Sequence, residues 1–192
     1  MNSSRGTRGF VTALAAALFC AACAAPPPKP VTRDSLVQKT ATVESINLPS
    51  RLVTLRGEDG GGFTVVVDPV VRNLDQVKVG DKLVVSYYEG LAAEVKKPGE
   101  GVEGVETEVA SARSEPGEKP GGGAGVTMRT TVTIESVDKS FNTVTFKRSD
   151  GMSRTVAIQT PEGQEFIRGL KKGDQVEITY TEAVAMEVKP AT

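Results

Sequence analysis

The sequence predicts an all-β protein in which two small barrels follow each other along the chain. Three observations favour this fold class: apolar and polar residues alternate in short runs, Gly-rich turns separate the runs, and the whole pattern occurs twice. The block KVGDKLVVSYYEGLAAEV at 78–95 returns as KKGDQVEITYTEAVAMEV at 171–188. Because the segments before these blocks also match, we expect two repeats of one unit, residues 37–97 and 129–190.

The first expected strand of each repeat contains TVESI at 42–46 or TIESV at 133–137. In the first copy, Val43 and Ile46 are out of phase and cannot lie on one face of a regular strand, and the second copy has the same irregularity. An extra residue in one strand of a pair has this effect. The pattern therefore predicts a β-bulge or a bend in a long first strand.

The second and third strands form a hairpin in each repeat. The turn contains Asp59-Gly60 in the first copy and Asp150-Gly151 in the second, and Asp-Gly is a strong hairpin signal between alternating segments. The flanking strands are LVTLR (52–56) and TVVV (64–67) in the first repeat, and TVTFK (143–147) and TVAI (155–158) in the second.

A short helix is expected after the third strand, because Asp68-Pro69 and Thr160-Pro161 each offer a capping oxygen followed by proline at the first helical position. The Gly-Asp pairs of the repeated block then make a turn into strand four. Strands four and five follow, as two separate strands of each repeat. Their apolar positions are Leu83, Val85, Tyr87, Leu91, Ala93 and Val95 in the first copy, and Val176, Ile178, Tyr180, Val184, Met186 and Val188 in the second.

Three strands, a helix and two more strands resemble the order of the OB-fold, a five-stranded partly open barrel. The expectation is therefore two tandem five-stranded OB-like barrels, each with a short helix between strands three and four. An SH3-like barrel is the alternative, because small barrels have similar sequence patterns. Residues 98–128 are rich in Gly, Pro and Glu, which is typical of a linker without a packed core.

The N-terminus has the pattern of a secretory signal peptide at residues 1–22: a basic start, a short apolar run and small residues. The run FCAAC resembles the lipobox of bacterial lipoproteins. That resemblance implies a lipid on Cys23, followed by a proline-rich tether at residues 23–36. Cys20 stands where the lipobox usually has Leu. Cleavage at Ala22-Cys23-Ala24 is the alternative.

The expected location is accordingly the cell envelope, as an outer-membrane lipoprotein that faces the periplasm. The lipid would make the membrane one partner, and an envelope protein is a second expected partner. Cleavage without lipidation would instead give a soluble periplasmic protein. The near-neutral net charge of −1 and the balance of acidic and basic residues within each repeat argue against binding of nucleic acid.

An enzymatic function is not expected. The chain has no histidine, the commonest general base, and its two cysteines both precede the globular part. No catalytic, cofactor-binding or metal-binding residue stands out. Acids recur in both repeats at Glu44 and Glu135, Glu89 and Glu182, and Glu94 and Glu187, without the closely spaced oxygen ligands of a calcium loop, and they are expected on a solvated face.

A copper-binding module is the alternative function. The strand order and the stretch DKSFNTVTFK are similar to small periplasmic copper-binding OB proteins, which hold copper with His, Met and Trp. This chain has no His and no Trp, so a copper(I) site would depend on Met128, Met152 and Met186.

The two repeats differ on one outward-facing surface. The first has Val66, Val84 and Tyr88 where the second has Ala157, Glu177 and Thr181. An exposed apolar patch marks a contact surface, either for the other repeat or for another envelope protein. The best-supported expectation is a non-enzymatic binding or scaffolding module with this contact surface.

Overall fold

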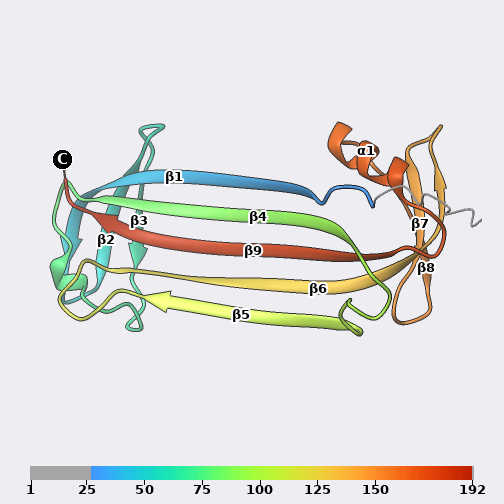
Figure 1. Ribbon diagram of the computed structural model, residues 1–192. Coiled ribbons are helices and arrows are strands. Elements are labelled where there is room, and N and C mark those ends of the chain that lie inside the picture. The colour runs from blue at the N-terminus through green and yellow to red at the C-terminus, as the bar shows by residue number, and fades with distance from the viewer. Residues whose placement is uncertain (1–26, 192) are drawn as a thin grey trace, which may run out of the picture.

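The strands of both repeats belong to one antiparallel sheet in the computed structural model, which describes residues 27–191 (Figure 1). The all-β prediction is confirmed. The sheet order is β3-β2-β1-β4-β9-β6-β7-β8, and β5 pairs with the free side of β6. The strands are β1 (Val31–Asn47), β2 (Leu52–Gly57), β3 (Gly62–Val66), β4 (Lys82–Lys96), β5 (Val105–Arg113), β6 (Gly121–Asp138), β7 (Thr143–Lys147), β8 (Ser153–Ala157) and β9 (Gln175–Lys189).

The sheet order shows the duplication directly, because β1 to β4 of the first repeat correspond to β6 to β9 of the second. The last strands of the two repeats, β4 and β9, pair along their whole length, from Lys82 opposite Lys189 to Lys96 opposite Gln175. At the centre of this pairing Glu89 lies opposite Glu182, its own counterpart in the other repeat. The repeats are therefore related by an approximate twofold axis that passes between these two glutamates.

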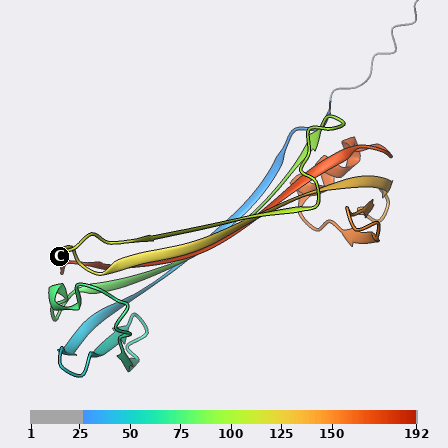
Figure 2. The ribbon, with the colours of Figure 1, turned by 90° about the horizontal axis from the view of Figure 1, so that it is seen from below.

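Two small hydrophobic cores lie at opposite ends of the sheet. The first cap consists of β2, β3 and a 3-10 turn at Leu74–Gln76, and the second cap of β7, β8 and helix α1 at Pro161–Gly169. The buried core residues are Val43, Val53, Leu55, Leu74 and Val77 in the first cap, and Val132, Ile134, Val144, Phe166, Ile167, Leu170 and Val176 in the second. Between the caps the long strands form a twisted single layer (Figure 2).

The structure does not confirm two tandem five-stranded OB-like barrels, nor the SH3-like alternative. The expected strands four and five of each repeat are one continuous strand, β4 or β9. The alternation of apolar and polar residues continues without a change of phase through Glu89 in β4 and Glu182 in β9. Each strand therefore keeps one apolar face along its whole length and is not interrupted by a turn. Two 15-residue strands pair with each other and draw both repeats into one open sheet.

The two repeats differ between the third strand and the last. In the second repeat, the Thr160 hydroxyl accepts a hydrogen bond from Gly163 N at 3.3 Å, and Pro161 begins α1. In the first repeat, Asp68 Oδ1 accepts from Val70 N at 2.8 Å, and only the 3-10 turn follows. A local turn closed by the Asp68 side chain competes with a helix, so the expected pair of helices is not present.

The other local turns follow the sequence expectations. The register of β1 with β2 shifts between Val43 and Ser45, and that of β6 with β7 between Ile134 and Ser136, which confirms the predicted bulge in both repeats. Both Asp-Gly turns close antiparallel hairpins. At the Gly-Asp turns, Gly80 and Gly173 both have φ of 93°.

The segments expected to be unstructured contain strands. Residues 98–128 hold β5 and the beginning of β6, and β1 starts at Val31, inside the expected tether. Every residue of β5 is exposed, so this strand forms through backbone pairing and needs no apolar core. The expected signal peptide at 1–22 and Cys23 lie outside the described residues.

Candidate functional site

One face of β4 and β9 is apolar along both strands except for Glu89 and Glu182 at its centre. Residues directly opposite each other in paired strands project from the same side of a sheet. Leu83 and Val188 on this face pack against the core of the first cap, and Val95 and Ile178 pack against that of the second. Both caps therefore cover the ends of the same face. Between them it carries Val37, Val85, Tyr87, Leu91, Val109, Val126, Met128, Tyr180, Val184 and Met186, which we call the apolar face.

The middle of the apolar face is open to solvent. The exposed fraction is 74% for Val109, 50% for Met186, 49% for Leu91 and 42% for Val184. Apolar residues that alternate with polar ones normally mark the buried side of a strand. Here no part of the described chain lies over them, so the face has the composition of a core and the exposure of a surface.

The apolar face continues into a hollow beneath the first cap. This hollow has a volume of about 330 Å³. Its floor includes Ala41, Leu83 and Val85 from the long strands, and Phe63 from the β2–β3 hairpin lies at its side. The cap therefore forms a wall at this end of the face.

Two glutamates and two tyrosines lie at the centre of the apolar face, around the approximate twofold axis. The Tyr87 hydroxyl donates to Glu182 Oε1 and the Tyr180 hydroxyl to Glu182 Oε2, both at 3.2 Å. Partial burial and the neighbouring carboxylates raise the pKa of Tyr180 to about 12, and the same causes raise the pKa of Tyr87. Glu89 lies beside Glu182 on the next strand.

This cluster can accept hydrogen bonds and attract a cation, but it has no group with the features of an activated nucleophile. Within residues 27–191, no group of three or more His, Cys, Asp or Glu side chains is placed to hold a metal ion. Three of the other recurring acids form ion pairs elsewhere: Glu44 with Arg56 at 2.5 Å, Glu94 with Lys96 at 2.8 Å and Glu187 with Lys189 at 2.7 Å.

The predicted contact residues do not form one patch. Val84 and Tyr88 lie on the opposite face of β4, where their neighbours on β9 are Glu187 and Ala183. Val66 is 74% exposed at the outer hairpin of the first cap, in register with Leu52. Val84 and Tyr88 thus lie on the more polar side of the long strands, and Val66 lies at the first cap.

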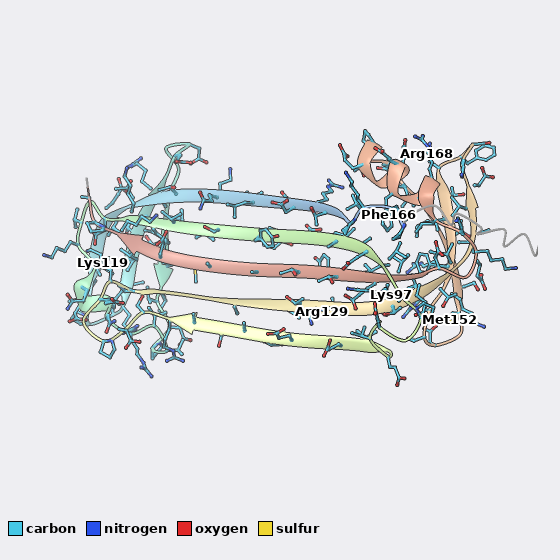
Figure 3. The ribbon with its side chains drawn as sticks, in the orientation of Figure 1. Lys97, Lys119, Arg129, Met152, Phe166 and Arg168 are labelled. Carbon is cyan, nitrogen blue, oxygen red and sulfur yellow. The ribbon has the colours of Figure 1, made fainter. Side chains whose placement is uncertain are left out.

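The three methionines of the copper hypothesis also lie in different regions. Met152 is in the turn of the β7–β8 hairpin at the second cap (Figure 3). Met128 lies opposite Tyr180, whereas Met186 lies opposite Val85, six residues further along β9. The described structure brings no two of them together as ligands.

Sequence reasoning missed the open apolar face, although the signal was present. The apolar phase of β4 and β9 extends over both strands, with Glu89 and Glu182 as its only charged members. A strand of this length is too long to lie under one small core, and this was the observation that could have identified the face.

Within the described part of the chain, no helix has the length and apolar character needed to span a membrane. The sequence matches no protein-family model and no curated protein.

Proposed function

We propose that this chain is a non-enzymatic binding or scaffolding module of the cell envelope, held there by a lipid on Cys23, and that the apolar face is its binding surface. The observation that carries the proposal is the exposure of this face between two caps that bury its ends. A surface of this kind suits a large apolar or amphipathic partner better than a small substrate, which binds in a concave pocket.

The binding surface can be tested by photo-crosslinking in living cells. Val184 and Ala185 are exposed neighbours on β9 whose side chains project from opposite faces. A photoreactive phenylalanine analogue at position 184 is expected to give crosslinked adducts, and the same analogue at position 185 serves as the matched control. Equal yields from the two positions, or no adduct from position 184, would contradict the proposal.

The anchor has its own test. Mass spectrometry of the mature N-terminus is expected to show a lipid-modified residue 23, and Cys23→Ser should release the protein from the membrane fraction. A mature chain that begins at Ala24 or Pro26 without lipid would contradict the proposed lipid anchor, but it would not bear on the proposed binding surface.

A further inference from the structure

The outer edge of β5 is a free strand edge that none of the described residues covers. β5 is nine residues long, pairs only with β6 in the sheet, and is exposed at every position. Such an edge presents unpaired N–H and C=O groups and is a template for another strand. Natural edges are commonly protected by charged side chains, lysine above all, by proline or by a bulge. VETEVASAR has no lysine, proline or bulge, and its charged residues are Glu106, Glu108 and Arg113.

The hydrogen-bond pattern identifies which residues of β5 offer their backbone to a new strand. Ser114, directly after β5, donates its backbone N–H to the carbonyl oxygen of Gly121 in β6, so the backbone groups of residue 114 point towards β6. Because backbone groups of an antiparallel strand point alternately to its two sides, the even-numbered residues of β5 face β6 and the odd-numbered ones face outward. The outward set is Val105, Thr107, Val109, Ser111 and Arg113.

We propose that a second copy of this chain occupies this edge, by antiparallel pairing of β5 with β5 about a twofold axis at Val109. In this register each outward residue meets another outward residue: Val109 meets Val109, Thr107 meets Ser111, and Val105 meets Arg113. A twofold contact of this kind is closed, so it forms a dimer and not a filament.

The charges of β5 agree with this register. Glu106 lies opposite Ala112 and Glu108 opposite Ala110 of the other copy, so no like charges meet across the contact. Both glutamates also have a cation within their own chain, because Arg129 lies 3.5 Å from Glu106 and 3.7 Å from Glu108 (Figure 3). A shift by two residues towards the N-terminus would place Glu106 against Glu108, which disfavours that alternative.

The long strands have a second free edge. It is the N-terminal half of β1, which pairs only with β4. Pairing of this half with itself about Leu36 would set Arg33 against Lys39 twice, and like charges directly opposite each other destabilise a strand pair. This register of β1 is therefore disfavoured, whereas pairing of β5 with itself about Val109 brings no like charges together.

A proline substitution tests whether the outward backbone is used. Val109→Pro removes an outward N–H and leaves the ladder to β6 intact, whereas Val109→Ala shortens the same side chain and keeps the N–H. In chains that begin at residue 23 with Cys23→Ser, sedimentation at up to about 0.1 mM protein should show a dimer, because this concentration populates a contact with a dissociation constant in the micromolar range.

Val109→Pro should weaken this dimer by more than about tenfold, and Val109→Ala by about threefold or less, because only the proline removes the two central hydrogen bonds. Circular dichroism melting checks that each variant is folded. A wild-type chain that stays monomeric at these concentrations, or a dimer that Val109→Pro leaves unchanged, would overturn the proposal.

A disulfide test does not depend on the proline variant. Val109→Cys should oxidise to a covalent dimer, because position 109 meets itself across the axis at a distance that a disulfide can span. Val105→Cys is the matched control: Val105 is also exposed, at 58% against 74% for Val109, and lies on the same face, but it meets Arg113 and should stay reduced. Equal disulfide yields from both positions would contradict the register.

The photo-crosslinking test at Val184 concerns the apolar face, so either proposal can fail without the other.

Discussion

At the scale of single residues, Asp81 shows how the connection between the repeats is fixed to the first cap. Its side chain is buried, accepts a hydrogen bond from Lys78 N at 2.8 Å and forms an ion pair with Lys119 from the loop between β5 and β6 (Figure 3). Burial alone would raise the pKa of Asp81, but the hydrogen bonds from Lys119 and Lys78 outweigh it and lower this pKa below its usual value.

Removal of the lysine should therefore destabilise the first cap. We expect Lys119→Met to lower the free energy of unfolding by roughly 1–3 kcal/mol near neutral pH, because it leaves the buried carboxylate without its cation. A depressed pKa in the folded state gives stability that is present above the unfolded pKa of about 3.9 and is lost as the pH falls through the folded value. The difference in the free energy of unfolding between Lys119→Met and the unchanged protein should consequently become smaller towards about pH 3.

Urea unfolding at the two pH values measures this effect. Lys172→Met in the second cap is the control, because Asp174 is only half-buried and accepts its hydrogen bond from Lys171 N. A Lys119→Met variant as stable as the control variant near neutral pH would contradict the assigned role of the ion pair.

The tyrosines at the centre of the apolar face provide a second test. The pKa of Tyr180 in the folded protein, about 12, is above the ordinary value of about 10, so the fold favours the neutral phenol. The resulting contribution to the stability of the protein is present below about pH 10 and is lost as the pH rises towards about 12. In a Tyr88→Phe background, Glu182→Gln should lower the pKa of Tyr180 by removing the negative charge beside it.

Phenolate absorbance during an alkaline titration reports the change. Glu187→Gln is a suitable control, because Glu187 lies on the opposite face of β9. If Tyr87 and Tyr180 both titrate near pH 10 in the Tyr88→Phe protein that keeps Glu182, the hydrogen bonds described around Glu182 are wrong.

At the scale of elements, the glycine-rich start of β6 is required by close approach of neighbouring backbone. A Cβ on Gly123 would lie 2.8 Å from the Val184 carbonyl oxygen, and one on Gly122 would lie 2.9 Å from the Ala112 carbonyl oxygen. Side chains are excluded there because the atoms they would meet belong to the paired strands themselves. The sequence suggested a linker at this point, since glycine runs are usual in loops.

Substitution of Gly123 should accordingly weaken the pairing of β6 with β9. We expect Gly123→Ala to cost about 1–3 kcal/mol of stability, the usual cost of forcing extra volume into a packed site. Gly62→Ala in β3 is the control, because its Cβ would be 3.9 Å from the nearest atom. Chemical unfolding of both variants tests this, and equal stabilities would contradict the explanation.

Local features of this fold could be predicted from the sequence, and long-range pairing could not. The bulges after Val43 and Ile134 and the Asp-Gly hairpins depend on residues close in the chain, and they are present. The pairing of β4 with β9 depends on residues about ninety positions apart, and alternation alone does not say which strand is the neighbour.

The same limit applies to the candidate site. The sequence shows that Tyr87 and Glu89 recur as Tyr180 and Glu182, but their gathering at one point follows from antiparallel pairing about the twofold axis. Val66, Val84 and Tyr88 are positions at which the repeats differ. The residues that share an open face are instead mostly those in which the repeats agree.

At the scale of the whole molecule, the two repeats depend on each other. The middle of β4 has β1 on one side and β9 on the other, and Ala93 and Val95 from the first repeat pack against the core of the second cap. Two independent barrels would unfold separately. The shared sheet predicts one cooperative transition for the full chain, which calorimetry can measure.

Division of the chain should show this dependence. A cut in the loop between β4 and β5 gives fragments 27–100 and 101–191, and neither fragment alone should unfold cooperatively. Mixed in equal amounts, they should regain the circular dichroism and melting transition of the intact chain. A fragment 27–100 that melts by itself at the temperature of the intact protein would contradict the single-sheet fold.

The pairing of Glu89 with Glu182 also has a meaning for the origin of the chain. A strand that lies antiparallel to its own repeat copy, centred on equivalent residues, has the geometry of a contact between two identical subunits. An ancestral protein with one repeat could have formed the same long sheet as a homodimer. Gene duplication and fusion would then have joined the two subunits through the segment that holds β5, which has no counterpart in the first repeat.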